Sequence, residues 1–197
     1  MMISKFKKGF TMIELLIVIA VLGVLAVAVL SAINPIEQIN RGRDTGSRSD
    51  AEQLLSAIDR YNASRPLWPW QDVSTDEVIV AWQQVTLLTP IGSVCPMLDN
   101  LRFDDTDAAC PGADEVKMSF INRIVGTNYN ALYTKFDGGA GDSVYVCFSP
   151  RSRSFSLEAN TRCLIAAEAA ELGADACGGC DDLNGASGTN VNCICLP

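Results

Sequence analysis

Apolar residues crowd into one segment near the start of the chain, residues 10–33, which reads FTMIELLIVIAVLGVLAVAVLSAI. Between Leu15 and Leu30 no side chain is polar, and Ser31 alone interrupts the run to Ile33. At about 1.5 Å of helical rise per residue this run extends roughly 28 Å, close to the hydrocarbon thickness of a bilayer. The pattern therefore predicts one membrane-spanning helix behind a short basic segment.

The pattern changes after this run, and a second helical stretch follows. Pro35 lacks a backbone donor and disfavours helix at the residue before it, so a break is expected near 33–35. Apolar residues recur at helical spacing from Ala51 to Tyr61, which predicts that helix resumes and continues to about residue 63. Two glycines weaken the stretch 41–50, which is expected to be soft.

The rest of the chain predicts a small mixed head. The segment RPLWPWQ at 65–71 is expected to be a loop fixed by aromatic burial. A capping-box pattern from Ser74 to Glu77 predicts a helix over 75–88, and a second helix is predicted over 114–125. Segments rich in Val, Tyr, Phe and Ser, separated by turn-forming residues, predict strands over the ranges 131–136, 143–148 and 153–158.

These elements together define an α+β fold class. A long N-terminal helix, membrane-spanning in its first half, is expected to pack on a small antiparallel β-sheet head with a disulfide-rich C-terminal region.

Charge and composition narrow the possible functions. The formal net charge is −8, and an acidic surface repels phosphate, so bulk binding to nucleic acid is not expected. Local basic patches are conceivable around Arg41, Arg43 and Arg48, or around Arg151 and Arg153, with solvated surface charge as the favoured interpretation. The chain has no histidine, which excludes Ser-His-Asp and Cys-His catalysis. We expect neither enzymatic activity nor a cofactor.

The start of the chain carries the most specific motif. Residues 7–26 read KKGFTMIELLIVIAVLGVLA, with the acid Glu14 at the front of the apolar run. An ionisable residue costs about 2.5–3.5 kcal/mol at the centre of a membrane helix, and a plain signal peptide gains nothing from it. An ordinary secretory signal is the competing interpretation, because the small residues Ser31 and Ala32 follow the core. The motif resembles the class III leader of type IV pilins and of type II secretion pseudopilins.

That resemblance implies how the chain is processed. A prepilin peptidase would cut between Gly9 and Phe10 and methylate the new amine of Phe10. Glu14 would then meet the N-terminal amine of a neighbouring subunit during assembly. The implied division is a leader peptide (1–9), a transmembrane and assembly helix (10–33), the second half of the N-terminal helix (34–64) and an extracytoplasmic globular head (65–197).

The resemblance also implies function, partners and location. The expected function is that of a structural subunit of a type IV pilus used for adhesion, twitching motility or DNA uptake; the alternative is a pseudopilin of a type II secretion system. The expected partners are prepilin peptidase, other pilin subunits and the pilus assembly platform. The precursor is expected as a single-pass protein of the inner membrane with a cytoplasmic N-terminus, and the mature form in a surface filament. A tethered enzyme or binding domain is a third interpretation.

Eight cysteines follow the apolar segment, and an even number in an exported head predicts disulfides. The preferred pairing joins Cys95 to Cys110 and Cys147 to Cys163, with the last four tying the C-terminal tail. A zinc site built from four thiolates of that tail is the less favoured alternative, because export favours oxidation. The tail cysteines are Cys177, Cys180, Cys193 and Cys195.

Two weaker signals concern oxygen ligands and glycosylation. Three acidic stretches, at 104–107, 137–142 and 181–184, offer carboxylates to calcium, but none has the full EF-hand pattern, so no metal is predicted. Asn62-Ala-Ser64 fits the glycosylation sequon.

Overall fold

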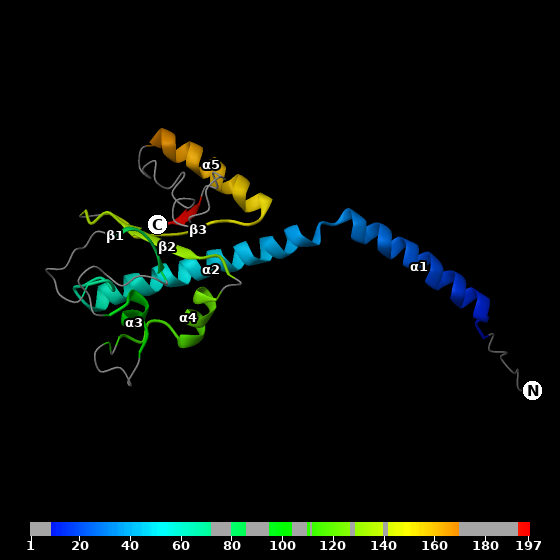
Figure 1. Cartoon of the computed structure of the whole chain (residues 1–197), viewed down its shortest axis with the longest axis horizontal. Helices are drawn as coiled ribbons and strands as arrows, with labels where there is room; N and C mark the ends of the chain where they lie inside the picture. The colour runs from blue at the N-terminus through cyan, green and yellow to red at the C-terminus, as the bar shows by residue number, and fades with distance from the viewer. Residues whose placement is uncertain are drawn as a thin grey trace, which may run out of the picture. The chain divides into compact units, whose positions relative to one another are not determined.

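The computed structural model describes residues 9–71, 80–85, 95–103, 110, 112–126, 129–139, 142–169 and 193–197 (Figure 1). The chain divides into two compact units, Met1–Gln38 and Ile39–Pro197, called here the N-terminal and the C-terminal unit.

The N-terminal unit is built around helix α1, Met12–Ala32. The helix ends at Ile33, whose backbone is extended with φ −101° and ψ 131°, as expected for a residue close before a proline. Helix α2, Pro35–Ser64, then begins with the proline at its first position, where the missing N–H costs nothing. Asn34 caps this start, because its Oδ1 accepts a hydrogen bond from the Glu37 amide at 3.4 Å. The predicted break at 33–35 is confirmed.

Helix α2 supplies one side of the core of the C-terminal unit. Its buried apolar residues recur every three or four positions: Ala51, Leu54, Ala57, Ile58 and Tyr61. The predicted extension to about residue 63 is confirmed. The expected soft section over 41–50 is wrong, since α2 is continuous there. Asp44, Ser47 and Asp50 are buried in that stretch, so tertiary contacts hold the helix against the cost of its two glycines.

The C-terminal unit contains a four-stranded antiparallel sheet in the order β1-β2-β3-β4. Its strands are β1 Val80–Gln84, β2 Leu132–Phe136, β3 Tyr145–Phe148 and β4 Ile194–Leu196. The strands predicted over 131–136 and 143–148 are confirmed as β2 and β3. The helix predicted over 75–88 is wrong for its described part: Val80–Gln84 is a strand because it pairs with β2, Gln83 opposite Thr134 and Gln84 opposite Tyr133.

Two short helices lie on the side of α2 away from the sheet (Figure 1). They are α3, Met97–Leu101, and α4, Met118–Val125. Helix α4 falls within the predicted helix 114–125 but begins four residues later. Phe120, Ile121 and Ile124 of α4 are buried in the core that α2 and the sheet share.

The strand predicted over 153–158 is wrong, because helix α5 occupies Arg153–Ala169. Ser152 starts this helix: its Oγ accepts a hydrogen bond from the Phe155 amide at 3.4 Å, and its carbonyl accepts from Ser156 N at 3.0 Å. The alternation Ser-Phe-Ser-Leu-Glu suggested a strand, but a capped start and the helix-favouring residues that follow outweigh it.

The loop after α2 is fixed by aromatic packing, as predicted. The rings of Trp68 and Trp70 are stacked, 5.2 Å apart at 4°, and Trp68 also lies 4.6 Å from the ring of Phe136 on β2. Trp70 is 2% exposed. Asn62, the sequon asparagine, donates from Nδ2 to the Leu67 carbonyl at 3.3 Å, so its amide supports this loop rather than projecting freely.

Candidate functional site

The start of α1 is organised by a capping box between Thr11 and Glu14. Thr11 has an extended backbone, φ −77° and ψ 149°, and its Oγ1 accepts a hydrogen bond from the Glu14 amide at 3.3 Å. In return, Glu14 Oε2 accepts from Thr11 N at 2.8 Å and from Thr11 Oγ1 at 2.7 Å. The carboxylate is therefore held at the first turn of the helix, next to residues 9–10.

The capping role of Thr11 was not predicted from the sequence, although Thr-x-x-Glu before an apolar run is the capping-box pattern. The capping box predicted from Ser74 to Glu77 lies outside the described residues.

The predicted cleavage point, between Gly9 and Phe10, precedes the first residue of α1. Both residues are exposed, Phe10 at 84%, and no atom lies within 4 Å of the position a Cβ would take on Gly9. A peptidase needs an extended, reachable backbone, which residues buried in a helix do not offer. The geometry at this bond is compatible with proteolysis.

Among the described residues of its unit, helix α1 has no apolar partner that buries it. Every large apolar side chain from Met12 to Leu30 is at least 46% exposed. Met12–Ser31 is long and apolar enough, by length and composition, to cross a membrane. A helix that is apolar all round requires lipid or other helices around it.

A second group of polar side chains lies in the C-terminal unit, and no sequence pattern predicted it. Asp44 on α2 is fully buried and accepts hydrogen bonds from Asn130 Nδ2 at 2.8 Å, from Arg151 N at 3.0 Å and from Ser152 N at 2.7 Å. A buried carboxylate surrounded by donors is a structural anchor. It joins α2 to the segment that connects β3 with α5.

Asp50, two turns further along α2, pairs with Arg123 of α4. Burial raises the pKa of the Asp50 carboxyl above its usual range, and the charge and hydrogen bond of Arg123 oppose this shift. The guanidinium of Arg123 also lies 5.4 Å from the centre of the Phe120 ring.

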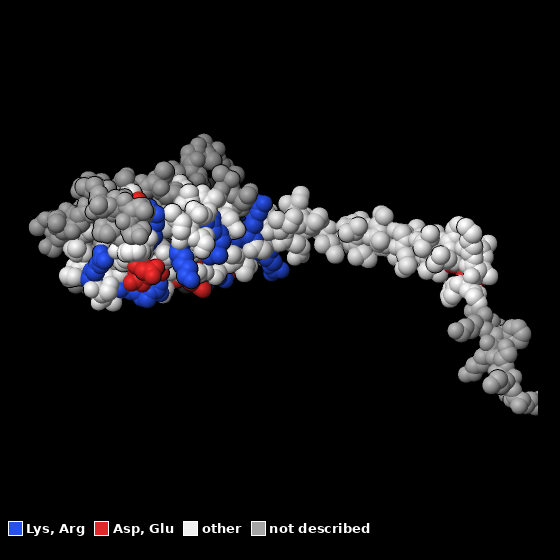
Figure 2. Space-filling model, turned by 90° about the horizontal axis from the view of Figure 1, so that it is seen from below, with Lys and Arg blue, Asp and Glu red and all other residues white. Residues whose placement is uncertain are grey.

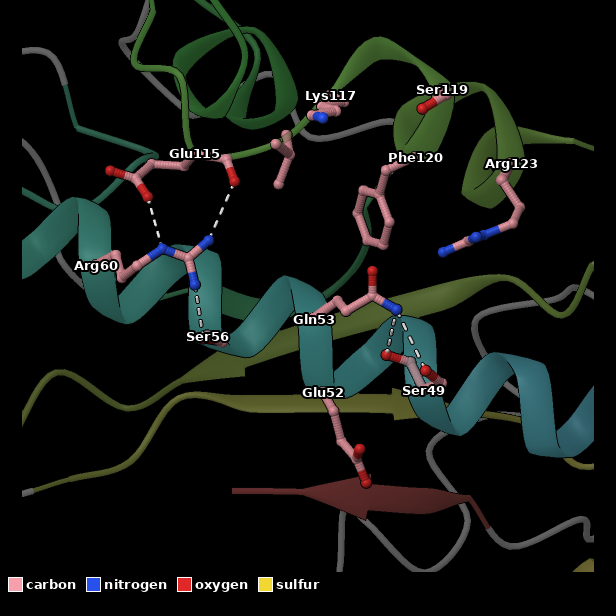
Figure 3. Close-up of a pocket in the computed structure, with 11 residues that line it drawn as sticks. Ser49, Glu52, Gln53, Ser56, Arg60, Glu115, Lys117, Ser119, Phe120 and Arg123 are labelled. Atoms are coloured by element: carbon pink, nitrogen blue, oxygen red, sulfur yellow. Dashed lines mark hydrogen bonds and ion pairs between the residues drawn. The ribbon is translucent and has the colours of Figure 1, made fainter.

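Helices α2 and α4 border a polar groove of about 480 Å³ (Figure 3). Its hydrogen bonds join its own walls: Arg60 donates to Glu115 Oε2 at 2.8 Å, to the Glu115 carbonyl at 3.1 Å and to Ser56 Oγ at 2.7 Å. Among the described residues, no serine of the groove bonds to a carboxylate.

Two disulfides join cysteines that both lie in the described part of the chain, and one of them differs from the preferred pairing. Cys95 and Cys110 are bonded, as that pairing had them. Cys147 is bonded to Cys195, so its predicted pairing with Cys163 is wrong. The reason is strand register: Cys147 of β3 lies directly opposite Cys195 of β4, with their Cα atoms 4.1 Å apart.

The tail cysteines do not provide the zinc site considered as an alternative. Cys193 and Cys195 are both disulfide-bonded, so neither offers a free thiolate. Cys177 and Cys180, and the side chain of Cys163, lie outside the described residues.

The acidic stretch 137–142 shows local pairing. Asp142 Oδ2 accepts a hydrogen bond from Gly139 N at 2.7 Å, and Asp137 lies 3.2 Å from Lys135 Nζ. Over the described part of the chain, no group of three or more Cys, Asp or Glu residues is arranged to hold a metal. The stretches at 104–107 and 181–184 fall outside that part.

Comparison with known families assigns the N-terminal segment. Residues 4–30 match the family model described as the prokaryotic N-terminal methylation motif, which is the class III prepilin leader. This range contains the Gly9–Phe10 bond, the capping box and most of α1. This segment is therefore similar to the N-terminus of type IV pilins and pseudopilins, which are structural proteins.

Neither curated proteins nor solved structures gave a match to the chain.

Proposed function

We propose that this chain is the structural subunit of a type IV pilus. Prepilin peptidase cuts the precursor between Gly9 and Phe10 and methylates the amine of Phe10. The subunit then assembles with other copies through its N-terminal helix, at the pilus assembly platform. Residues 1–9 form the leader, 10–33 the transmembrane and assembly helix, 34–64 the second half of the N-terminal helix, and 65–197 the extracytoplasmic head.

The observation that carries this proposal is the position of the Glu14 carboxylate. The capping box holds it at the start of an otherwise apolar helix, bonded to the amide of Thr11. Cleavage before Phe10 creates an ammonium group one residue before Thr11. A carboxylate and an ammonium are both costly in lipid, and each is satisfied when neighbouring helices pair them.

The exposed apolar surface of α1 supports two successive environments for the same helix. In the inner membrane, lipid surrounds the single span, with the N-terminus in the cytoplasm and the head outside. In the filament, the helices of other subunits replace the lipid. Both environments bury the side chains that are exposed in the isolated chain.

A pseudopilin of a type II secretion system is the second candidate, since both groups share the leader. The disulfides Cys95–Cys110 and Cys147–Cys195 favour the exposed fibre, because cross-links resist unfolding outside the cell.

The test is the intact, non-reduced mass of the protein in filaments sheared from producing cells. A major species without residues 1–9 and with one added methyl group supports the proposal. Cleaved protein confined to the envelope would favour the pseudopilin instead, and an uncleaved chain would refute both.

A substitution separates assembly from processing. Glu14→Ala is expected to leave cleavage and membrane insertion intact while sheared filaments disappear. Glu52→Ala, which removes an exposed acid of α2, is the matched control and should assemble normally. Normal filaments from Glu14→Ala would contradict the role assigned to this carboxylate.

A further inference from the structure

Two groups of arginines that are far apart in sequence come together in the C-terminal unit. Arg41 and Arg43 lie on α2, on either side of the face that bears Asn40 and Asp44. Arg151 lies against that face, since its backbone amide donates to Asp44 and its carbonyl accepts from Asn40 Nδ2 at 3.4 Å. We call Arg41, Arg43 and Arg151 the arginine patch.

The guanidinium groups of the patch are available. Arg41 and Arg151 are exposed and Arg43 is half-buried. Within the described residues, none of the three has an acidic partner, whereas nearby Arg48 is paired with Glu158. The carboxylate of Asp44 is fully buried and already accepts several hydrogen bonds. The local field at the patch is therefore positive, although the whole chain carries −8.

Figure 2 shows one face of the C-terminal unit with basic side chains spread along it and acidic ones confined to small areas. On the face that this view shows, the described basic side chains form a positive surface that a phosphate-bearing partner can approach.

The length of chain between the membrane span and the arginine patch limits which surfaces the patch can reach. Arg41 follows the last residue of the predicted span, Ser31, by ten positions, and Arg43 by twelve. At about 1.5 Å per helical residue the arginines follow the span by on the order of 15 Å of chain, and this short connection keeps the bilayer surface within their reach. Arginine binds phosphate through two parallel hydrogen bonds, which suits it to this layer better than lysine.

We propose that the arginine patch binds the headgroups of anionic phospholipids on the outer face of the inner membrane, while the subunit awaits assembly. This inference rests on the proposed function, because it requires α1 to span the membrane. The patch adds a second membrane contact to the single span and holds the C-terminal unit at the bilayer surface. Each exposed arginine near an anionic surface strengthens binding about fivefold.

The experiment uses the full chain in lipid nanodiscs, one set of phosphatidylcholine alone and one containing about one third phosphatidylglycerol. Arginines are modified with phenylglyoxal, and the rate at each site is read by mass spectrometry. We expect modification of Arg41, Arg43 and Arg151 to slow at least about threefold in the anionic discs and to recover in high salt. Arg60 and Arg65 are internal controls, because Arg60 lies roughly 25 Å along α2 from Arg43.

A charge-matched pair of variants tests whether the lipid binds at this place. Native mass spectrometry counts the phosphatidylglycerol released with the protein from mixed discs. R41Q/R43Q/R151Q is expected to lose the excess of phosphatidylglycerol that the unmodified chain retains, and R60Q/R65Q/K117Q is expected to keep it. Equal modification rates in the two lipids, or equal losses in the two variants, would overturn the inference.

Two further outcomes distinguish a failure of the lipid-binding inference from a failure of the proposed function. Failure of the chain to enter either kind of disc would refute the membrane-spanning α1, and with it the proposed function. If R41Q/R43Q/R151Q keeps its phosphatidylglycerol but no longer forms filaments, the patch contacts another copy of the chain and not lipid, and the inference is wrong.

Discussion

The Oδ2 atom of Asp44 on α2 lies 2.5 Å from the hydroxyl of Ser152, the residue that caps α5. The two residues are 108 positions apart in the sequence. The same carboxylate accepts from the backbone amides of Arg151 and Ser152. One buried side chain therefore fixes where the last long helix of the C-terminal unit begins.

Replacement of Asp44 by alanine is expected to destabilise the C-terminal unit by about 3 kcal/mol, because buried donors lose a charged acceptor. Urea unfolding of the full chain in detergent, followed by tryptophan fluorescence, measures the loss. Asp59→Ala removes an exposed acid of the same helix and should cost less than about 0.5 kcal/mol. Equal effects of the two substitutions would show that Asp44 is not an anchor.

Asp50 makes stability depend on pH in a predictable direction. Burial raises the pKa of this carboxyl in the folded state, against the pull of Arg123. As the pH rises past the ordinary aspartate pKa, Asp50 deprotonates in the unfolded chain before it does so in the folded chain. The free energy of unfolding therefore falls until the pH passes the raised pKa of the folded state. Asp50→Asn should flatten the stability profile between pH 4 and 7, measured by urea unfolding. Asp59→Asn is the control, and an unchanged slope in Asp50→Asn would contradict the assignment.

The two disulfides are expected to contribute different amounts to stability. Cys147–Cys195 closes a loop of 48 residues and Cys95–Cys110 one of 15. The chain-entropy relation gives about 4 kcal/mol for the longer loop and about 3 kcal/mol for the shorter. C147S/C195S should therefore unfold at lower urea than C95S/C110S. The reverse order would mean that the C-terminal strand is held mainly by its backbone hydrogen bonds.

Replacement of two glycines by alanine is expected to change the stability of the chain in opposite directions. Gly46 is helical, and no atom lies within 4 Å of the position of a new Cβ, so Gly46→Ala should stabilise α2 by about 1 kcal/mol. Gly112 has φ +60°, and a Cβ there would lie 1.7 Å from the Arg102 carbonyl oxygen. Gly112→Ala should therefore destabilise the unit. Thermal unfolding of both variants beside the wild type checks the two signs.

The sequence predicted those parts of the fold that neighbouring residues determine. The leader motif, the break at Pro35 and the strands β2 and β3 depend on contiguous patterns. Distant partners determine the rest. Val80–Gln84 is a strand because β2 offers it an edge, and Cys147 pairs with Cys195 because of the β3–β4 register. No local pattern reports that Asp44 will meet Ser152.

The uniform exposure of the apolar side chains of α1 has a consequence for how subunits are exchanged. Each such side chain left in water costs about 1.5–3 kcal/mol, so the whole helix would cost tens of kcal/mol. In the proposed filament, a subunit could then not dissolve into the surrounding liquid at any useful rate. Shortening of such a fibre would instead return intact, reusable protein to the bilayer.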